Sequence, residues 1–489
     1  MSNGILASQL AKQVRGKLYG EDRLLTGQFT FLNKANKDDI VIRHWINAKG
    51  IEIAEDKGVS CVITQNPQDN AIQTVEDGSI ALIVTDHIEY ATAFAIRKTV
   101  TECAGNAFKV AVTGTNGKST TTHILYTIFS DLDYNTYTNT DAESEGNTLI
   151  DPRVSTEIYD YYQKMGLIDV IALEVSEVQG WDDRIMEDHS YQMISALDAD
   201  VSIITNASKD HMNLVESFDE LLYEISGAAR SLLNNDRESL LVLNYDDYNI
   251  RQMAELVQDK SNIRVMFFGL YDSNNPLDVY YKDNVGIYAG DELYIEYDDL
   301  PFTSVHFIQD IMATIAVCVY KGLDNQDVVN SLKNYKPLAR RFIRLKSNPV
   351  IIDDFAHNPS GIKLTIENGS KLGENLYVID AIRGSRGEDI NSEIAQALSD
   401  TLRDMDNYVL VLTKSCDVVN NLNTVTEGEL RVFTSVLDDN NIQYTVYDDL
   451  EQSLVDTIKK AGDDDVVLLL GAQGMDPASG LLKKNNIIR

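Results

Sequence analysis

Short apolar runs, each followed by a polar turn and a segment of helical periodicity, recur along the whole chain. In its first part, residues 38–45, 59–64 and 79–86 predict strands. Between the first two of them, residues 46–58 have the pattern of a helix that closes at Gly58. This part of the chain therefore predicts a small α/β domain without a catalytic motif of its own.

Further along the chain the apolar runs become continuous. Residues 108–112, 169–176, 201–208 and 239–247 contain such runs, and each is followed by a helix or a loop. Strands that are buried on both faces of a parallel sheet have this pattern. From about residue 268 to about residue 305 the pattern alternates instead and turns at Gly and Asp, which predicts an antiparallel hairpin region before a helix from Phe307 to Lys321.

A third block repeats the alternation of strands and helices. Its predicted strands cover residues 349–355, 375–382, 407–414 and 465–474. Helices separate them, as in a doubly wound sheet.

The patterns together predict an α/β fold with three domains. These are a small α/β N-terminal domain (1–107), a central P-loop ATPase domain with a mostly parallel sheet (108–336), and a C-terminal doubly wound, Rossmann-like domain (337–489). The length of 489 residues suits about three domains, and 44% apolar residues allow each of them to bury a core.

Composition excludes several classes of protein. With 42 Lys and Arg against 76 Asp and Glu, the formal charge is −34, which argues against sequence-independent binding of nucleic acid. The four cysteines are scattered without a C-x-x-C pair, so neither a disulfide framework nor a zinc site is expected. No apolar run is long enough for a signal peptide or a membrane span, and we therefore expect a cytoplasmic protein.

The most informative segment follows the strand that ends at Val112. Its glycines let backbone N–H groups approach a phosphate, and the helix that follows favours negative charge at its start. Lys118 can reach the terminal phosphates, and the Ser119 hydroxyl can bind magnesium. The alternative is a Gly/Thr-rich turn without a ligand. The segment consists of Gly114, Thr115, Asn116, Gly117, Lys118, Ser119 and Thr120.

Two further polar side chains follow predicted strands of the same block. Glu174 ends one apolar run, and His211 follows another after a polar turn. Ligands of open α/β sheets bind at the carboxyl ends of strands, so both side chains are candidate ligands of Mg²⁺. Taken singly, Glu174 is explained as a capping residue and His211 as a turn histidine.

The third block opens with two charged segments. The pair Arg340 and Arg341 can clamp a phosphate, or it can be surface charge on a linker. The stretch from Asp353 to Pro359 ends a strand, and its polar groups can bind ribose hydroxyls or form a simple turn.

The segments GTNGKST, EVS, TNASKDH, LNYDD, RRF and DDFAHNP follow one another in an order that resembles the Mur ligase superfamily. These enzymes form amide bonds at the expense of ATP. The resemblance covers the central and C-terminal domains in their motifs. The layout of the N-terminal domain is similar to the nucleotide-sugar-binding domain of the muramyl-tripeptide type.

The resemblance implies roles for individual residues. Gly114 to Thr120 would hold the phosphates of ATP, with Lys118 on the β- and γ-phosphates. Mg²⁺ would be bound by Ser119, Glu174 and His211. In the C-terminal domain, Arg341 would reach the phosphate, Asp354 would contact the ribose, and His357 lies on the same loop.

The resemblance also implies a reaction. ATP phosphorylates a carboxylate, the amine of an amino acid attacks the acyl phosphate, and phosphate leaves. Charge neutralisation and positioning are what phosphoryl transfer needs, and Lys118, Glu174, His211 and Arg341 are the residues implied to supply them. Because Arg341 and Asp354 lie in another domain than Lys118, the site is expected to form when the domains close.

The chain departs from the family in several places. A carbamoylated lysine of many members falls here at Ser226 or Gly227, so that either Glu224 supplies the negative charge or the second metal is held differently. Residues 306–310 replace the asparagines that meet adenine. The signatures for the uridine nucleotide and for diaminopimelate read Leu32-Asn33-Lys34 and Thr413-Lys414-Ser415-Cys416.

The predicted function is a peptide ligase that adds an amino acid to a UDP-linked peptide precursor. The acidic composition and the changed signatures favour an archaeal pseudomurein peptide ligase. One alternative is a cyanophycin- or folylpolyglutamate-like ligase, although the N-terminal domain argues against the folate type. The other is a non-catalytic ATP-binding regulatory protein. We expect a monomer whose partners are the UDP-linked peptide and the amino acid, with no nucleic acid and no membrane span.

Overall fold

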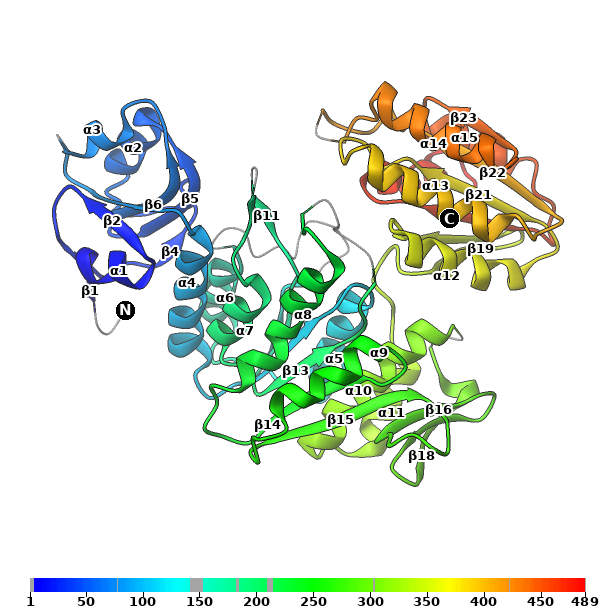
Figure 1. Ribbon diagram of the computed structural model, residues 1–489, viewed down its shortest axis with the longest axis horizontal. Coiled ribbons are helices and arrows are strands. Elements are labelled where there is room, and N and C mark those ends of the chain that lie inside the picture. Colours follow the sequence, from blue (N-terminus) through cyan, green and yellow to red (C-terminus); the bar gives the residue numbers. More distant parts are fainter. Residues whose placement is uncertain are drawn as a thin grey trace. The chain divides into compact units, whose positions relative to one another are not determined.

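The computed structural model describes residues 4–76, 78–140, 153–181, 184–208, 214–301, 304–421 and 423–488 (Figure 1). By its internal contacts the chain divides into two units. The N-terminal unit contains the described residues up to Tyr335, and the C-terminal unit contains those from Lys336 onward. Each unit is built around parallel sheets, which confirms the predicted α/β class.

The N-terminal unit begins with a small sheet in the order β2-β7-β6-β5-β4. Its strands pair in parallel except for β2, which runs antiparallel to β7. The predicted strands and the predicted helix of this region are confirmed. The elements are α1 (Ala7–Gln13), β2 (Gly16–Tyr19), β4 (Phe29–Thr30), β5 (Ile40–Ile46), α2 (Ala48–Asp56), β6 (Cys61–Pro67), α3 (Ala71–Glu76) and β7 (Ala81–Thr85), beside a short pair of β1 (Ile5–Leu6) and β3 (Leu24–Leu25).

The second sheet of this unit, the central sheet, has the order β18-β17-β16-β15-β14-β13-β8-β10-β9. The strands from β9 to β16 in this order are parallel, and β17 and β18 form the predicted antiparallel hairpin region. Since β16 pairs in parallel with β15, the hairpin extends the same sheet. The strands are β8 (Phe108–Thr113), β9 (Thr136–Thr138), β10 (Val170–Glu174), β13 (Val201–Ile204), β14 (Ser239–Asn244), β15 (Ile263–Leu270), β16 (Val279–Lys282), β17 (Gly286–Ala289) and β18 (Glu292–Glu296).

Helices cover both faces of the central sheet (Figure 1). On one face, α4, α6, α7 and α8 bury their apolar side chains in a common core with the strands. On the other, α5, α10 and α11 pack together. The helices are α4 (Ile88–Ala104), α5 (Lys118–Asp131), α6 (Arg153–Met165), α7 (His189–Leu197), α8 (Phe218–Leu232), α9 (Tyr248–Gln252), α10 (Val305–Lys321) and α11 (Asn325–Asn334).

Helix α4 joins the two sheets of the N-terminal unit. Its first turns pack into the core of the small sheet, and its later turns pack into the core of the central sheet. At its start, the buried Glu89 carboxylate forms an ion pair of 2.7 Å with Arg184 of the short strand β12 (Arg184–Ile185). Apolar burial and a paired charge therefore hold the small sheet on the central one.

The C-terminal unit is a sheet in the order β19-β20-β24-β21-β22-β23. Adjacent strands of this sheet are parallel, except that β19 runs antiparallel to β20. Helices α12, α13 and α14 pack on one face and α15 and α16 on the other, which confirms the doubly wound prediction. The elements are β19 (Ile343–Ser347), β20 (Val350–Asp354), α12 (Pro359–Gly369), β21 (Leu376–Ala381), α13 (Glu388–Leu402), β22 (Tyr408–Thr413), α14 (Glu427–Asp439), β23 (Tyr444–Tyr447), α15 (Leu450–Ile458), β24 (Val466–Leu470) and α16 (Ala478–Lys484).

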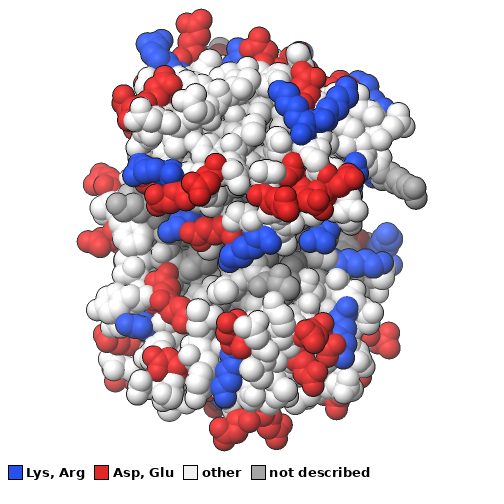
Figure 2. All heavy atoms as spheres, turned by 90° about the vertical axis from the view of Figure 1, so that its right-hand side faces the viewer, with Lys and Arg blue, Asp and Glu red and all other residues white. Residues whose placement is uncertain are grey.

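Acidic and basic side chains are mixed on one face of the molecule (Figure 2). Figure 2 shows Lys and Arg side chains interspersed with Asp and Glu over the face that it draws. Within the described ranges, no helix has both the length and the apolar character required to cross a membrane.

Candidate active site

The phosphate loop connects α5 to β8, an interior strand that is third from one edge of the central sheet. Gly114 and Gly117 both have positive φ, at 120° and 87°. A Cβ on Gly114 would overlap the hydroxyl oxygen of Thr205, and one on Gly117 would overlap the carboxylate of Asp310. Both the backbone conformation and the close neighbours therefore require glycine at these two positions.

The loop is held in place by the residues that follow β13. Asn206 Oδ1 accepts from the backbone N–H of Asn116 at 3.0 Å, and its Nδ2 donates to the Asn116 carbonyl at 2.9 Å. The backbone N–H of Thr115 donates to the Asn206 carbonyl at 2.9 Å. Ser208 N donates to the Thr115 hydroxyl at 3.0 Å. Residues 206–208, which the sequence indicated only as the turn before His211, thus hold the phosphate loop in place.

Lys118, the first residue of α5, is folded back onto its own loop. Its Nζ donates to the carbonyls of Gly114 at 2.6 Å and Thr115 at 3.0 Å, and to Glu177 Oε2 at 2.9 Å. Glu177 was not singled out in the sequence. The only signal for it was its spacing, three residues beyond Glu174 in the turn after β10.

Ser119 and Glu174, two of the residues predicted to bind Mg²⁺, lie within hydrogen-bond distance of each other. Ser119 Oγ donates to Glu174 Oε1 at 3.1 Å. Asn139 fixes the backbone of Glu174 from both sides, accepting from its N–H at 2.8 Å and donating to its carbonyl at 2.9 Å. Glu174 Oε2 is buried and has no hydrogen-bond partner among the described residues.

An unpartnered carboxylate oxygen beside a hydroxyl is a fitting ligand set for a hard cation such as Mg²⁺. The residues present therefore fit the metal. The third predicted ligand, His211, lies outside the described residues. Within those residues, no group of three or more His, Cys, Asp or Glu side chains is arranged to hold a metal ion.

The packing of α8 explains why no long side chain occupies position 227, one of the two positions at which the carbamoylated lysine of other family members falls. A Cβ on Gly227 would overlap Ser190 Oγ and the backbone nitrogen of Tyr191, because α8 packs tightly on α7. The backbone carbonyl of Glu224 accepts a hydrogen bond from Ser190 Oγ at the start of α7. Burial raises the pKa of Glu224 to about 7.

The stretch that replaces the adenine-binding asparagines also reaches the loop. Asp310, on α10, is buried and accepts from Thr121 Oγ1 at 3.2 Å in the first turn of α5. The neighbouring Gln309 donates to Asp246 at 2.8 Å. Burial lowers the pKa of His306 to about 4, so this imidazole is neutral near pH 7.

In the C-terminal unit, the predicted nucleotide-binding residues gather around the ring of Phe355. The guanidinium of Arg341 lies 5.0 Å from the ring centre, and His357 Nδ1 bonds to the Phe355 carbonyl at 2.9 Å. Asp354 accepts from Thr365 Oγ1 at 2.7 Å, while burial raises its pKa to about 6. Arg341, Asp354 and His357 are therefore neighbours within this unit.

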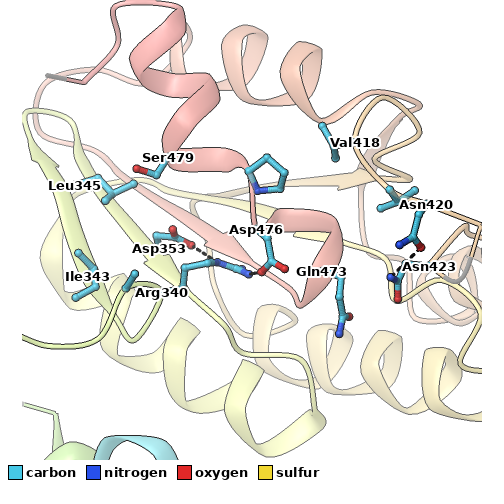
Figure 3. Close-up of a pocket in the computed structure, with 13 residues that line it drawn as sticks. Arg340, Ile343, Leu345, Asp353, Val418, Asn420, Asn423, Gln473, Asp476 and Ser479 are labelled. Carbon is cyan, nitrogen blue, oxygen red and sulfur yellow. Dashed lines mark hydrogen bonds and ion pairs between the residues drawn. The ribbon is translucent and has the colours of Figure 1, made fainter. Parts of the chain in front are cut away.

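The adjacent Arg340 is buried and has a different environment. Its guanidinium contacts Asp353 Oδ1 at 3.2 Å and also pairs with Asp476 (Figure 3). It donates to the carbonyl of Ala472 at 3.1 Å and to that of Gly471. Arg340, Asp353 and Asp476 line a cavity of about 530 Å³, to which residues of β19 and of the segments after β22 and β24 also contribute.

Comparison with known proteins places these sites in a family. The model of the Mur ligase middle domain matches residues 112–318, and that of the Mur ligase glutamate ligase domain matches residues 340–473. The chain belongs to the Mur ligase superfamily. The residues of the phosphate loop lie within the first matched range, and the residues around the ring of Phe355 lie within the second.

One curated Mur ligase is similar to this chain over part of its length. The chain is 26% identical to the UDP-N-acetylmuramoylalanine–D-glutamate ligase of Clostridioides difficile over 261 residues, which is 51% of this chain and 50% of that ligase. The alignment thus spans about half of this curated relative.

Solved structures share the whole fold. MurF from Acinetobacter baumannii is 16% identical and gives a TM-score of 0.70, with 99% of this chain and 98% of that one covered. A pseudomurein peptide ligase type C from Methanothermus fervidus is also 16% identical and gives a TM-score of 0.56. That alignment covers 92% of this chain and 94% of the other one. The likeness to MurF, which covers 99% of this chain, extends over the small N-terminal sheet, and neither family model includes that sheet.

Proposed function

We propose that this Mur ligase homologue uses ATP to activate a carboxylate as an acyl phosphate and joins an amino acid to a UDP-linked peptide precursor. The observation that carries the proposal is the first turn of α5. Lys118 and Ser119 begin this helix at the end of a glycine loop, and Glu174 reaches it from the neighbouring strand. Cation, hydroxyl and carboxylate are the groups that bind a nucleotide phosphate and its metal.

In this proposal the residues act mainly by position and charge. Backbone N–H groups at the start of α5 and the ammonium of Lys118 bind the phosphates. A carboxylate oxygen of the acceptor attacks the γ-phosphorus and ADP leaves. The amine then attacks the acyl carbon, and phosphate leaves with the bonding electrons. Bound Mg²⁺, held by Ser119 and Glu174, with His211 as the further proposed ligand, would neutralise charge on the phosphates.

The C-terminal residues supply the rest of the proposed nucleotide site. The guanidinium of Arg341 binds phosphate oxygens, and Asp354 binds the ribose hydroxyls. A carboxyl whose pKa is about 6 can accept a hydrogen bond from a hydroxyl or, when protonated, donate one. We assign residues 337–489 to the incoming amino acid as well, and residues 1–107 to the nucleotide-linked precursor.

The test is a coupled assay of the full chain with ATP, Mg²⁺, a set of UDP-linked peptides and pooled amino acids. We expect ADP, phosphate and a new amide in equal amounts, and only when acceptor and amino acid are both present. ATP turnover that does not depend on the acceptor, with no amide by mass spectrometry, would contradict the proposal.

As the acceptor we propose a UDP-linked peptide of pseudomurein synthesis. The acidic composition and the changed segments Leu32–Lys34 and Thr413–Cys416 support this choice over the muramyl peptides of bacteria. The kcat/KM for a pseudomurein precursor is then expected to exceed that for the corresponding muramyl peptide by at least about tenfold. Equal values would refute this part alone.

A further inference from the structure

Glu177 is a buried carboxylate at the phosphate loop to which the proposed reaction assigns no role. It lies in the turn after β10 and is fully buried. Its Oε2 and the Lys118 ammonium form an ion pair of 2.9 Å, in which the two side chains are 1% and 14% exposed. A pair this well buried is costly to break by removing either partner.

The pair competes directly with a nucleotide for Lys118. An ammonium has three hydrogens to donate, and Lys118 makes three hydrogen bonds to described groups, two to loop carbonyls and one to Glu177. To bind a phosphate, Lys118 must give up one of them. The bond to Glu177 is the one that a second anion replaces, because phosphate and carboxylate attract the same charge.

Release of Lys118 would remove the ammonium with which the buried Glu177 carboxylate forms this ion pair. Glu174 is in a related position already, since its Oε2 is buried and unpartnered among the described residues. The two carboxylates contact consecutive residues of α5, Ser119 and Lys118. They therefore converge on the same helix turn from one strand end.

We propose that Glu177 exchanges partners when magnesium and ATP bind. In the free protein its carboxylate positions the Lys118 ammonium. In the complex it passes the ammonium to the phosphates and becomes a ligand of Mg²⁺ beside Ser119 and Glu174. Mg²⁺ commonly binds through one or two carboxylates together with phosphate oxygens, which is the set that this exchange provides. The inference rests on the proposed use of ATP and does not depend on the ligase step.

The test measures equilibrium binding of the non-hydrolysable analogue AMP-PNP by calorimetry, in Mg²⁺ and in EDTA, without acceptor or amino acid. We expect wild type to bind about ten- to a hundredfold more tightly in Mg²⁺. In Glu177→Gln this ratio should fall to about threefold or less. The variant should also bind more tightly than wild type in EDTA, because Lys118 is no longer held by a charge.

Glu102→Gln is the matched control. Glu102 pairs with Lys98 at 3.0 Å on α4, away from the loop, and both affinities should stay at wild-type values. An unchanged Mg²⁺ ratio in Glu177→Gln would overturn the exchange. Failure of wild type to bind the nucleotide at all would instead contradict the proposed function.

A second measurement keeps the inference testable should Glu177→Gln fold poorly. In Lys118→Met the Glu177 carboxylate has lost its cation, so Mg²⁺ alone should raise the midpoint of thermal unfolding more than it does in wild type. Adding Glu177→Gln to this variant should abolish the increment. An increment that survives in the double variant would refute a direct contact between Glu177 and the metal.

Discussion

The two units of the chain treat buried acidic groups at their strand ends in opposite ways. In the N-terminal unit, Glu174 and Glu177 are engaged by Ser119 and Lys118 of the phosphate loop. In the C-terminal unit, Asp354 and Asp380 lie in one register row of the sheet, on either side of Leu470. Burial raises the pKa of Asp380 to about 7, and its Oδ2 has no partner among the described residues.

The difference shows what each strand end can bind. Carboxylates that stand beside a cation or a hydroxyl remain available to a charged ligand such as a metal-bound phosphate. In the C-terminal unit, burial outweighs the effect of the Thr365 hydroxyl and the nearby Arg341 guanidinium on the pKa of Asp354. Asp354 and Asp380 therefore keep a proton closer to neutral pH than an ordinary aspartate and suit hydroxyl groups better than ions. In our proposal the metal-bound phosphates therefore lie at the first site, and the second site supplies the sugar contact of Asp354 and the phosphate contact of Arg341.

The largest effect should come from breaking the ion pair of the first site. Lys118→Ala is expected to lower ATP turnover by about 10²–10³-fold, because a charge aimed at the transferring phosphate is lost. It should also lower the free energy of unfolding by about 3–5 kcal/mol, since the buried Glu177 carboxylate loses its ion pair with the Lys118 ammonium. Phosphate release and urea denaturation measure the two effects.

The double variant Lys118→Ala/Glu177→Gln separates these two losses. Its stability should return towards wild type, while turnover stays low. Full turnover in Lys118→Ala would mean that the phosphate loop has been misinterpreted.

The next effect compares two adjacent arginines of the second site. Arg340→Ala should lower the free energy of unfolding by about 3 kcal/mol, because Asp353 and Asp476 lose their shared cation. Arg341→Ala should change stability by less than about 1 kcal/mol and instead lower kcat/KM for ATP by at least about tenfold. Denaturation and steady-state kinetics of both variants provide the test.

Arg340→Lys serves as the control for geometry. A lysine keeps the charge but lacks the planar fork that reaches two carboxylates and two carbonyls at once, so most of the stability loss should remain. If Arg341→Ala lowered stability and Arg340→Ala lowered kcat/KM for ATP, then Arg340 would be the phosphate contact and Arg341 the structural residue.

The sequence predicted the strand ends much better than the contacts made there. Continuous apolar runs mark buried strands, so the polar residues that follow them, including Glu174 and Asp354, could be placed at sheet edges. The local pattern alone did not separate Arg340 from Arg341, and only the family resemblance selected Arg341, because residues 340 and 342 have positive φ and the direction of each side chain depends on that turn.

Other contacts depend on packing between distant segments. Asp310 meets α5 only because α10 lies against that helix. The short edge strands β19 and β23 went unpredicted, since β19 has half-exposed positions and β23 lacks a buried run. Local pattern therefore gave the parallel framework, and tertiary packing decided which groups pair within it.

The smallest predicted effect concerns Asp380. Its pKa is about 7 in the fold and near 3.8 in the unfolded chain. Between these values the folded state keeps a proton that the unfolded state has lost, so this group makes the free energy of unfolding fall as pH rises from about 4 to about 7. Asp380→Asn has no such proton and should be more stable than wild type by about 2 kcal/mol at pH 8, with no gain at pH 4. Urea denaturation across this range measures the slope. Asp439 is exposed, so Asp439→Asn should reproduce the wild-type slope. A slope in Asp380→Asn equal to that of wild type would show that the Asp380 carboxyl is ionised in the fold. The contrast between the strand ends of the two units would then be smaller than proposed.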